Sequence, residues 1–264
     1  MHNKVLLQEM TWEEVEEAIT RSGGVILIPI GSIEQHARHL PEGTDTYCAI
    51  GVAVEAAKET GAVVAPPLWY GWSPQHMAYP GTVSVKPQIL IDLIVEICKS
   101  LSKHGFNKII LVNGHRISNN PWIQLAAAIA SEESKAKVVP VDIAYIARQA
   151  YDELGFGPLG HGDEAETSHM LHLHPELVYM EKAFDKYVAK QELYNPDPRS
   201  TEDTVLYTPS PPEVNLARKD VTGGGSGNPK VASKKKGEKL HKYTVAKLIR
   251  LIEVLKKRES RLEL

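Results

Sequence analysis

Carboxylates and histidines gather in a short segment that directly follows an apolar run. The run is Val25–Ile30, and Glu34, His36 and Asp45 follow it. Polar side chains of this kind are costly to bury unless they are paired or bound to something. Because Glu34 and His36 are two residues apart, they point the same way on an extended segment. With Asp45 they form a histidine–carboxylate set suited to zinc, manganese or iron.

A second candidate ligand follows another apolar run, Lys108–Val112. The tripeptide Asn113-Gly114-His115 has turn chemistry, so a surface histidine in a turn is one interpretation. The run has the character of a central strand, however, and its carboxyl end then faces the same crevice as Glu34. We therefore expect His115 to be a ligand. Asp45 also has a structural interpretation, because a carboxylate at the start of a helix can act as its N-cap.

The densest polar cluster lies between His161 and His169. Acidic residues favour a helix start, so an exposed helix terminus is one interpretation of this cluster. The other is one more metal-binding carboxylate together with a pair that transfers protons. The nearby His169, His172 and His174 have no obvious acidic partner, and we interpret them as structural.

A loop rich in aromatic and hydrogen-bonding side chains covers Gly71–Thr82. It is either an ordinary connection or the wall of a small polar pocket. By contrast, Gly155–Gly160 fits the G-x-G-x-x-G pattern but follows a helical segment and opens no apolar helix. It therefore lacks the context of a dinucleotide site.

The elements that must position these residues alternate between strand and helix. Strands are predicted at 25–30, 62–65, 108–112 and 136–143, and helices after the Thr11/Glu14 capping box and at 45–60, 87–104, 119–133 and 234–257. This alternation predicts a parallel sheet covered on both sides. In such sheets ligands bind beyond the carboxyl ends of the strands, where the polar clusters fall. The stretch 184–220 breaks the pattern and is a lid, an interface arm or a surface insertion, with one short strand at 204–208.

The bulk composition excludes several classes of protein. The chain has 264 residues, 42% of them apolar and 24% charged, with a formal net charge of −3. No global field therefore attracts nucleic acid or an anionic membrane. Cys48 and Cys98 are expected to be reduced core residues, and no signal peptide or membrane-spanning run is visible. We expect one cytoplasmic domain over 1–264.

Five motifs in order resemble the creatininase (creatinine amidohydrolase) family. They are Gly31-Ser-Ile-Glu-Gln-His36, Pro41-x-x-Thr-Asp45, Tyr79-Pro-Gly-Thr82, Asn113-Gly-His115 and His161…Glu166-Thr-Ser168. The resemblance covers roughly residues 8–255. It implies a three-layer α/β/α fold with a mostly parallel sheet, two divalent metal ions (zinc first, manganese or iron as alternatives) and a ring-like homo-oligomer, commonly a hexamer.

The resemblance also implies roles for individual residues. Glu34, Asp45 and His115 would hold one ion, and His36 would hold the other together with the bridging Asp45. His161 matches the position of a general acid/base. Creatininase has a metal-binding glutamate two residues after the histidine of Asn-Gly-His, where this chain has Ile117. We predict that Glu164 replaces it, and that Glu166 orients His161 or a ligand.

The substrates of the family are small, polar and often cyclic. Our first prediction is metal-dependent hydrolysis of a C–N amide bond, and the alternative is hydrolytic C–C ring opening of a cyclic polyol ketone. A non-catalytic metal-binding or assembly protein is a third interpretation. The departures at Arg116 and Ile117 argue against creatinine itself. The residues expected to select the substrate are Trp72, Gln75, His76, Tyr79 and Arg116.

Overall fold

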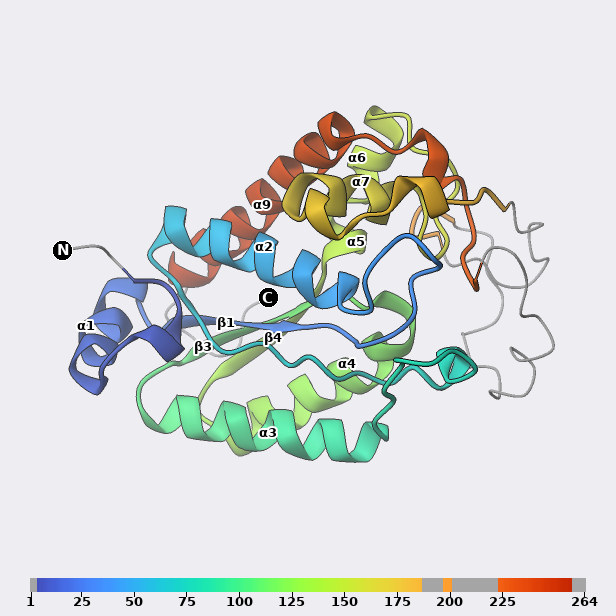
Figure 1. The fold of residues 1–264 in the computed structure, drawn as a ribbon. Coiled ribbons are helices and arrows are strands. Elements are labelled where there is room, and N and C mark those ends of the chain that lie inside the picture. The colour runs from blue at the N-terminus through green and yellow to red at the C-terminus, as the bar shows by residue number, and fades with distance from the viewer. Residues whose placement is uncertain (1–3, 187–196, 201–222, 258–264) are drawn as a thin grey trace.

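Four parallel strands form the centre of the computed structural model, which describes residues 4–186, 197–200 and 223–257 (Figure 1). The strands are β1 (Val25–Ile30), β2 (Val63–Val64), β3 (Lys108–Asn113) and β4 (Lys137–Asp142). Their order in the sheet is β2-β1-β3-β4. The register pairs Ile30 of β1 with Asn113 of β3, so the two strands end side by side.

Long helices cover both faces of this sheet (Figure 1). One face packs against α2 (Thr44–Thr60) and α9 (Lys234–Lys257), and the other against α3 (Pro87–Lys103) and α4 (Arg116–Glu133). The first helix, α1 (Trp12–Ser22), adds apolar residues to the second face. The predicted three-layer α/β/α architecture is therefore confirmed.

The apolar run of β1 reflects this two-sided burial. Ile26, Ile28 and Ile30 pack on the α3/α4 face, whereas Val25 and Leu27 pack on the α2/α9 face. All are buried. Burying one such aliphatic side chain stabilises the fold by about 1.5–3 kcal/mol, so both faces favour apolar residues and the strand shows no alternation.

The helix boundaries follow their capping residues. The Thr11 side chain accepts from the Glu14 amide, and the Glu14 carboxylate accepts from the Thr11 amide, as the capping box predicted. Helix α4 begins at Arg116, three residues before the predicted start. The Asn113 side chain holds the preceding turn by accepting from the His115 amide at 3.0 Å, so the chain enters the helix directly after β3.

Shorter elements lie over the carboxyl ends of the strands. They are α5 (Ile143–Ile146), α6 (Arg148–Glu153) and α7 (Glu164–Leu173), with single 3₁₀ turns at Pro74–His76, Pro175–Leu177, Met180–Lys182 and Pro229–Val231. A further 3₁₀ turn, Leu7–Glu9, precedes α1 at the other end of the sheet (Figure 1). Helix α7 packs tightly on α9, where a Cβ on Gly237 would come within 1.7 Å of the Ser168 carbonyl oxygen. Most of the 184–220 excursion, including the predicted strand at 204–208, lies outside the described residues.

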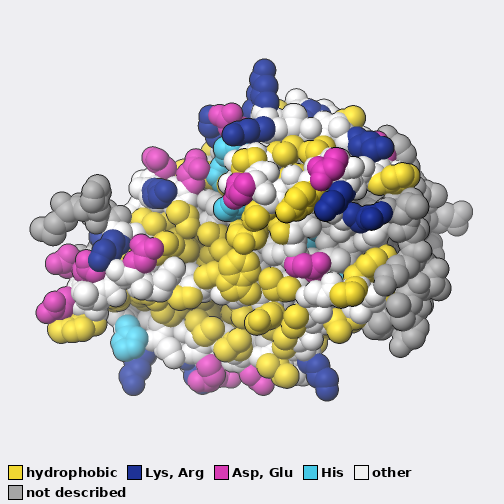
Figure 2. All heavy atoms as spheres, viewed as in Figure 1, with side chains coloured by type: hydrophobic (Ala, Val, Ile, Leu, Met, Phe, Trp, Pro, Cys, Tyr) yellow, Lys and Arg dark blue, Asp and Glu magenta, His cyan; other side chains and the backbone are white. Residues whose placement is uncertain are grey.

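The surface carries a broad apolar area, which Figure 2 shows across the middle of one face. Exposed large apolar residues include Tyr70, Val83, Ile89 and Leu93. Exposed apolar areas can mark contacts with other molecules, and the homo-oligomer stays a prediction. Within the described ranges, no helix is both long and apolar enough to cross a membrane.

Candidate metal centre

Three elements bring four of the predicted ligands together at the carboxyl edge of the sheet. The segment after β1 supplies Glu34 and His36, the first turn of α2 supplies Asp45, and the residue after the turn that ends β3 is His115. Each is at most 6% exposed. His115 Nδ1 lies 3.2 Å from Glu34 Oε1 and 3.1 Å from Asp45 Oδ2, while His36 Nε2 lies 3.1 Å from Asp45 Oδ1. Asp45 therefore sits between two histidines with one oxygen toward each.

Two glycines allow these segments to approach each other. A Cβ on Gly114 would come within 2.1 Å of the Asp45 carbonyl oxygen, and one on Gly31 within 2.2 Å of Thr46 Oγ1. Contacts this short do not occur for real side chains, so the turn after β3 and the segment after β1 need glycine where they meet the start of α2.

The ligand atoms form overlapping donor sets within the described residues. One set is Glu34, Asp45 and His115, and a second is His36, Asp45 and Glu166. The two sets share Asp45, as the family resemblance implied. Glu34 and His36 also form a set with His161.

The structure differs from the prediction at Glu164. Its carboxylate is buried but bonded elsewhere: Oε1 accepts from Lys236 Nζ at 2.5 Å, and Oε2 accepts from the Gly157 amide at 2.9 Å. Glu166, which we expected only to orient other groups, instead has Oε2 3.9 Å from His36 Nε2. The two residues are two positions apart on α7 and so lie on opposite sides of the helix. The geometry therefore favours Glu166 over Glu164 as the additional ligand.

The carboxylates of the site favour a positive charge among them. Burial lowers the pKa of His36, but Asp45 outweighs this and raises it to about 10. Burial likewise opposes the charged form of His115, yet Glu34 and Asp45 raise its pKa well above the usual value. Glu34 Oε2 is buried and accepts no hydrogen bond from the described residues, whereas the buried Asp45 Oδ2 faces His115 Nδ1 at 3.1 Å. Buried, clustered carboxylates beside histidines are the donor set that divalent zinc or manganese prefers, so the residues fit a metal centre.

His161 is placed to handle a proton beside this cluster. Its Nε2 donates to the Gln35 carbonyl oxygen, which leaves Nδ1 3.8 Å from Glu34 Oε1. Burial and the neighbouring His36 lower the pKa of His161 to about 4. The imidazole is therefore neutral at pH 7, with the lone pair of Nδ1 toward the ligands. The ring stacks on His76, with the centroids 4.3 Å apart.

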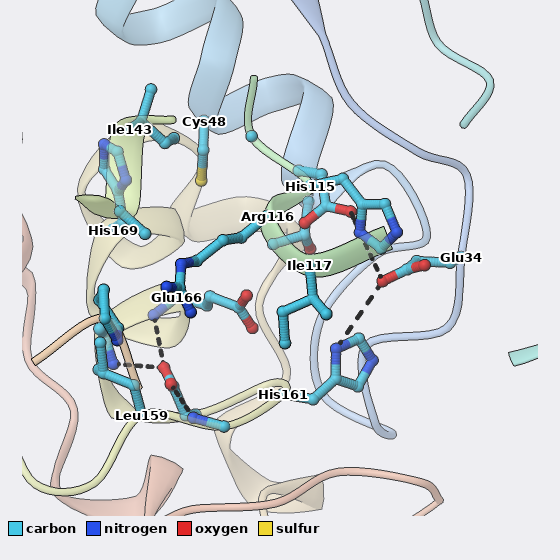
Figure 3. A pocket seen from close by; sticks show the side chains of 18 of the residues that line it. Glu34, Cys48, His115, Arg116, Ile117, Ile143, Leu159, His161, Glu166 and His169 are labelled. Atoms are coloured by element: carbon cyan, nitrogen blue, oxygen red, sulfur yellow. Dashed lines mark hydrogen bonds and ion pairs between the residues drawn. The ribbon is translucent and has the colours of Figure 1, made fainter. Parts of the chain in front are cut away.

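A cavity of about 260 Å³ opens beside the centre, and Figure 3 shows part of its wall. Of the predicted substrate-binding residues, Gln75, His76 and Arg116 line it. Gln75 donates to Ser118 Oγ at 3.0 Å, and Arg116 Nε lies 3.2 Å from Asp142 Oδ2.

Trp72 and Tyr79 do not line this cavity. Trp72 packs against the apolar cluster on the α3/α4 face, and its backbone carbonyl lies 3.4 Å from His115 Nε2. The aromatic content of the loop therefore does not predict which of its side chains face the site.

Sequence reasoning missed other residues at the site. Ser73 Oγ lies 3.3 Å from His115 Nε2, and both serines of the pair Ser32–Ser73 are buried. Cys48, Tyr151, His169 and Leu240 also line the cavity. From the sequence we interpreted Cys48 as a core residue and His169 as structural, and did not single out Ser73 within the Gly71–Thr82 loop, so only their convergence in space identifies them.

Such a fold and site define a class of protein: α/β hydrolases that hold metal ions through histidines and carboxylates beyond the ends of parallel strands. The family model described as creatininase (creatinine amidohydrolase) matches residues 8–252. The chain belongs to the creatininase family of hydrolases.

Individual relatives agree with this assignment. The chain is 28% identical over 256 residues to creatinine amidohydrolase of Pseudomonas putida, covering 90% of this chain and 92% of that protein. It is 33% identical over 187 residues to 3-dehydro-scyllo-inosose hydrolase of Thermotoga maritima, covering 69% of this chain but only 60% of that protein. A solved structure of a mutant creatininase of the Zn-Zn type superposes with a TM-score of 0.81 at 27% identity, covering 97% of this chain and 99% of that one.

Proposed function

We propose that the chain hydrolyses a C–N amide bond with the help of two divalent metal ions. The observation that carries this proposal is the pair of donor sets that share Asp45, with His161 beside them. One ion would be held by Glu34, Asp45 and His115, and the other by His36, Asp45 and Glu166. When bound, such a pair activates a water molecule and polarises the carbonyl group under attack.

The residues of the chain then have separate tasks. Because His161 Nε2 is held by the Gln35 carbonyl, only Nδ1 can take up a proton and return it to the departing nitrogen. Gln75 and Arg116 lie on the cavity wall, where they can orient polar groups of the substrate. Ser73, through its contact with His115 Nε2, holds the ring that faces Glu34 and Asp45.

The wall of the cavity favours an amide over a polyhydroxylated ring. Apolar residues line the part away from the ligands, among them Cys48, Ile143 and Leu240. The polar side chains in this part are His169 and Tyr151, so a ring with more hydroxyl groups than these two can pair loses hydrogen bonds to water, which costs roughly 1–3 kcal/mol for each unpaired hydroxyl. The match to a creatinine amidohydrolase covers 92% of that protein, which also supports an amide substrate.

Ring opening of a cyclic polyol ketone is the second candidate. It is favoured by the 33% identity to an inosose hydrolase, although the match spans 60% of that protein. The same metal centre can serve either reaction, because both begin with attack of water on a carbonyl carbon.

Activity measurements on the full chain separate these candidates. Zinc-loaded protein is assayed on lactams, formamides and keto-inositols, before and after chelation. We expect turnover of an amide, its loss on chelation and its return with zinc. Asp45→Asn should abolish turnover, whereas Asp92→Asn on the exposed side of α3 is the matched control and should keep it. Turnover that survives thorough chelation would exclude the proposed chemistry, and turnover of keto-inositols alone would favour the second candidate.

A further inference from the structure

The cavity extends beyond the metal centre, and we call the end away from the predicted ligands the inner compartment. Its wall is formed by residues of α2, α5, α6, α7 and α9, namely Cys48, Ile143, Tyr151, Ala165, His169 and Leu240. Figure 3 shows Cys48, Ile143 and His169 at one end of the cavity, and Glu34, His115 and His161 at the other, with Arg116 and Glu166 between them. All six residues of the inner compartment are at most 8% exposed.

A chain of hydrogen bonds orients His169 in this compartment. His169 Nε2 lies 2.8 Å from His241 Nδ1, and His241 Nε2 lies 3.0 Å from Glu55 Oε2. A carboxylate only accepts, so His241 carries its hydrogen on Nε2 and accepts at Nδ1. His169 must then donate from Nε2, which leaves the lone pair on its Nδ1.

Both imidazoles stay neutral in the fold, as this arrangement requires. Burial, together with His241 and His172, lowers the pKa of His169 to about 3. Burial also lowers the pKa of His241, against the opposing effect of Glu55. Among the described residues, His169 Nδ1 has no hydrogen-bond partner, although the residue is only 5% exposed. His169 lines the cavity, so a donor on a ligand bound there can supply the hydrogen bond that Nδ1 is able to accept.

We propose that the inner compartment binds an apolar, preferably aromatic, group of the substrate that carries one N–H or O–H donor, and that His169 Nδ1 accepts from this donor. The proposal deepens the proposed hydrolase function, because it names the part of the substrate remote from the scissile bond. Tyr151 also reaches the compartment, but its hydroxyl can donate or accept and so does not select. His169 selects a ligand that donates a hydrogen bond, because Glu55, through His241, fixes which nitrogen of His169 accepts.

Binding of two small probes tests this proposal without any turnover. Phenol and fluorobenzene have nearly the same shape, but only phenol carries a donor. Their dissociation constants are measured on the metal-loaded full chain, and crystals soaked with each probe locate it. We expect phenol to bind in the inner compartment about three- to tenfold more tightly than fluorobenzene, as one net hydrogen bond provides.

Three variants identify the group responsible. His169→Phe removes the acceptor while keeping an aromatic ring, and should bring the two probes within about twofold of each other. Glu55→Gln changes a half-exposed side chain, so the core should not be disturbed. The new amide can donate as well as accept, so His241 is no longer held in one tautomer and the preference for phenol should decrease. Glu59→Gln, exposed on the same helix, is the matched control and should leave the preference intact.

The outcomes separate this proposal from the proposed hydrolysis. Equal affinity of the wild-type chain for both probes, phenol bound outside the inner compartment, or a preference that survives in Glu55→Gln and His169→Phe would each overturn it. Absence of amide turnover would overturn the proposed function while leaving the probe result to stand by itself.

Discussion

Two glutamates on the first turn of α7 provide a sharp test of the metal centre. Glu166 faces His36 and Asp45, whereas Glu164 faces Lys236 and the Gly157 amide. In Glu166→Gln the second donor set retains only His36 and the shared Asp45. Two ligands do not hold a divalent ion firmly, since protein sites use three or four. We therefore expect the metal content to fall from about two ions per chain to about one.

The matched variant Glu164→Gln should keep both ions. Its effect is on stability, because it leaves the Lys236 ammonium without its buried anionic partner, and the Glu164 side chain is only 3% exposed. Removing one member of such a pair lowers the free energy of unfolding by about 1–3 kcal/mol. This range already allows for screening by solvent, because the lysine side chain is 30% exposed.

Elemental analysis of the purified variants measures the metal content, and urea unfolding measures the stability. Loss of an ion from Glu164→Gln, with two ions kept by Glu166→Gln, would refute the assignment of Glu166. That result would restore Glu164 as the ligand, as the sequence pattern predicts.

The proton acceptor, a buried histidine and a glycine contact give three more tests. His161→Gln should lower kcat by about 10²–10⁴-fold with unchanged metal content, because the proton acceptor is lost but the ligands remain; loss of metal instead would make His161 a ligand. The free energy of unfolding should decrease as the pH falls below 6.5, because His169 takes up a proton in the unfolded chain but not in the fold, where its pKa is about 3. At pH 5 the decrease in the free energy of unfolding amounts to about 2 kcal/mol, which urea unfolding measures. If the free energy of unfolding depended on pH in His169→Phe as it does in the wild-type chain, this explanation would be contradicted. Gly114→Ala should lower metal affinity and stability together, since its Cβ would meet the Asp45 carbonyl oxygen at 2.1 Å. Such overpacking costs about 1–3 kcal/mol, and calorimetric zinc titration with thermal unfolding detects both effects.

Local patterns predict much of the fold because the physics behind them is local. The apolar run Val25–Ile30, the Thr11/Glu14 capping box and the helix Lys234–Lys257 all occur where the sequence predicts them. Their signals depend on neighbours a few residues away. Where a boundary depends on the turn that precedes it, as at the start of α4, the prediction is displaced.

In the candidate site, too, local patterns predict some features and not others. The order of strands places Glu34, His36 and His115 at one edge of a parallel sheet, because carboxyl ends of parallel strands meet there. Trp72 and Tyr79 were expected at the cavity and do not line it, since a loop's composition does not say which side chains it turns inward. No local signal marks the contact of His169 with His241, which lie 72 residues apart.

The sequence by itself determined the chemistry available to this protein: which histidines and carboxylates follow which strands, and hence a metal-binding edge. Only the tertiary structure decided which glutamate of α7 faces that edge. Glu164 and Glu166 are two residues apart on one helix, so they point in nearly opposite directions for any rotation of the helix about its axis. The rotation of α7 chooses between them, and that rotation is fixed by its close packing against Gly237 of α9, a contact between segments far apart in the chain.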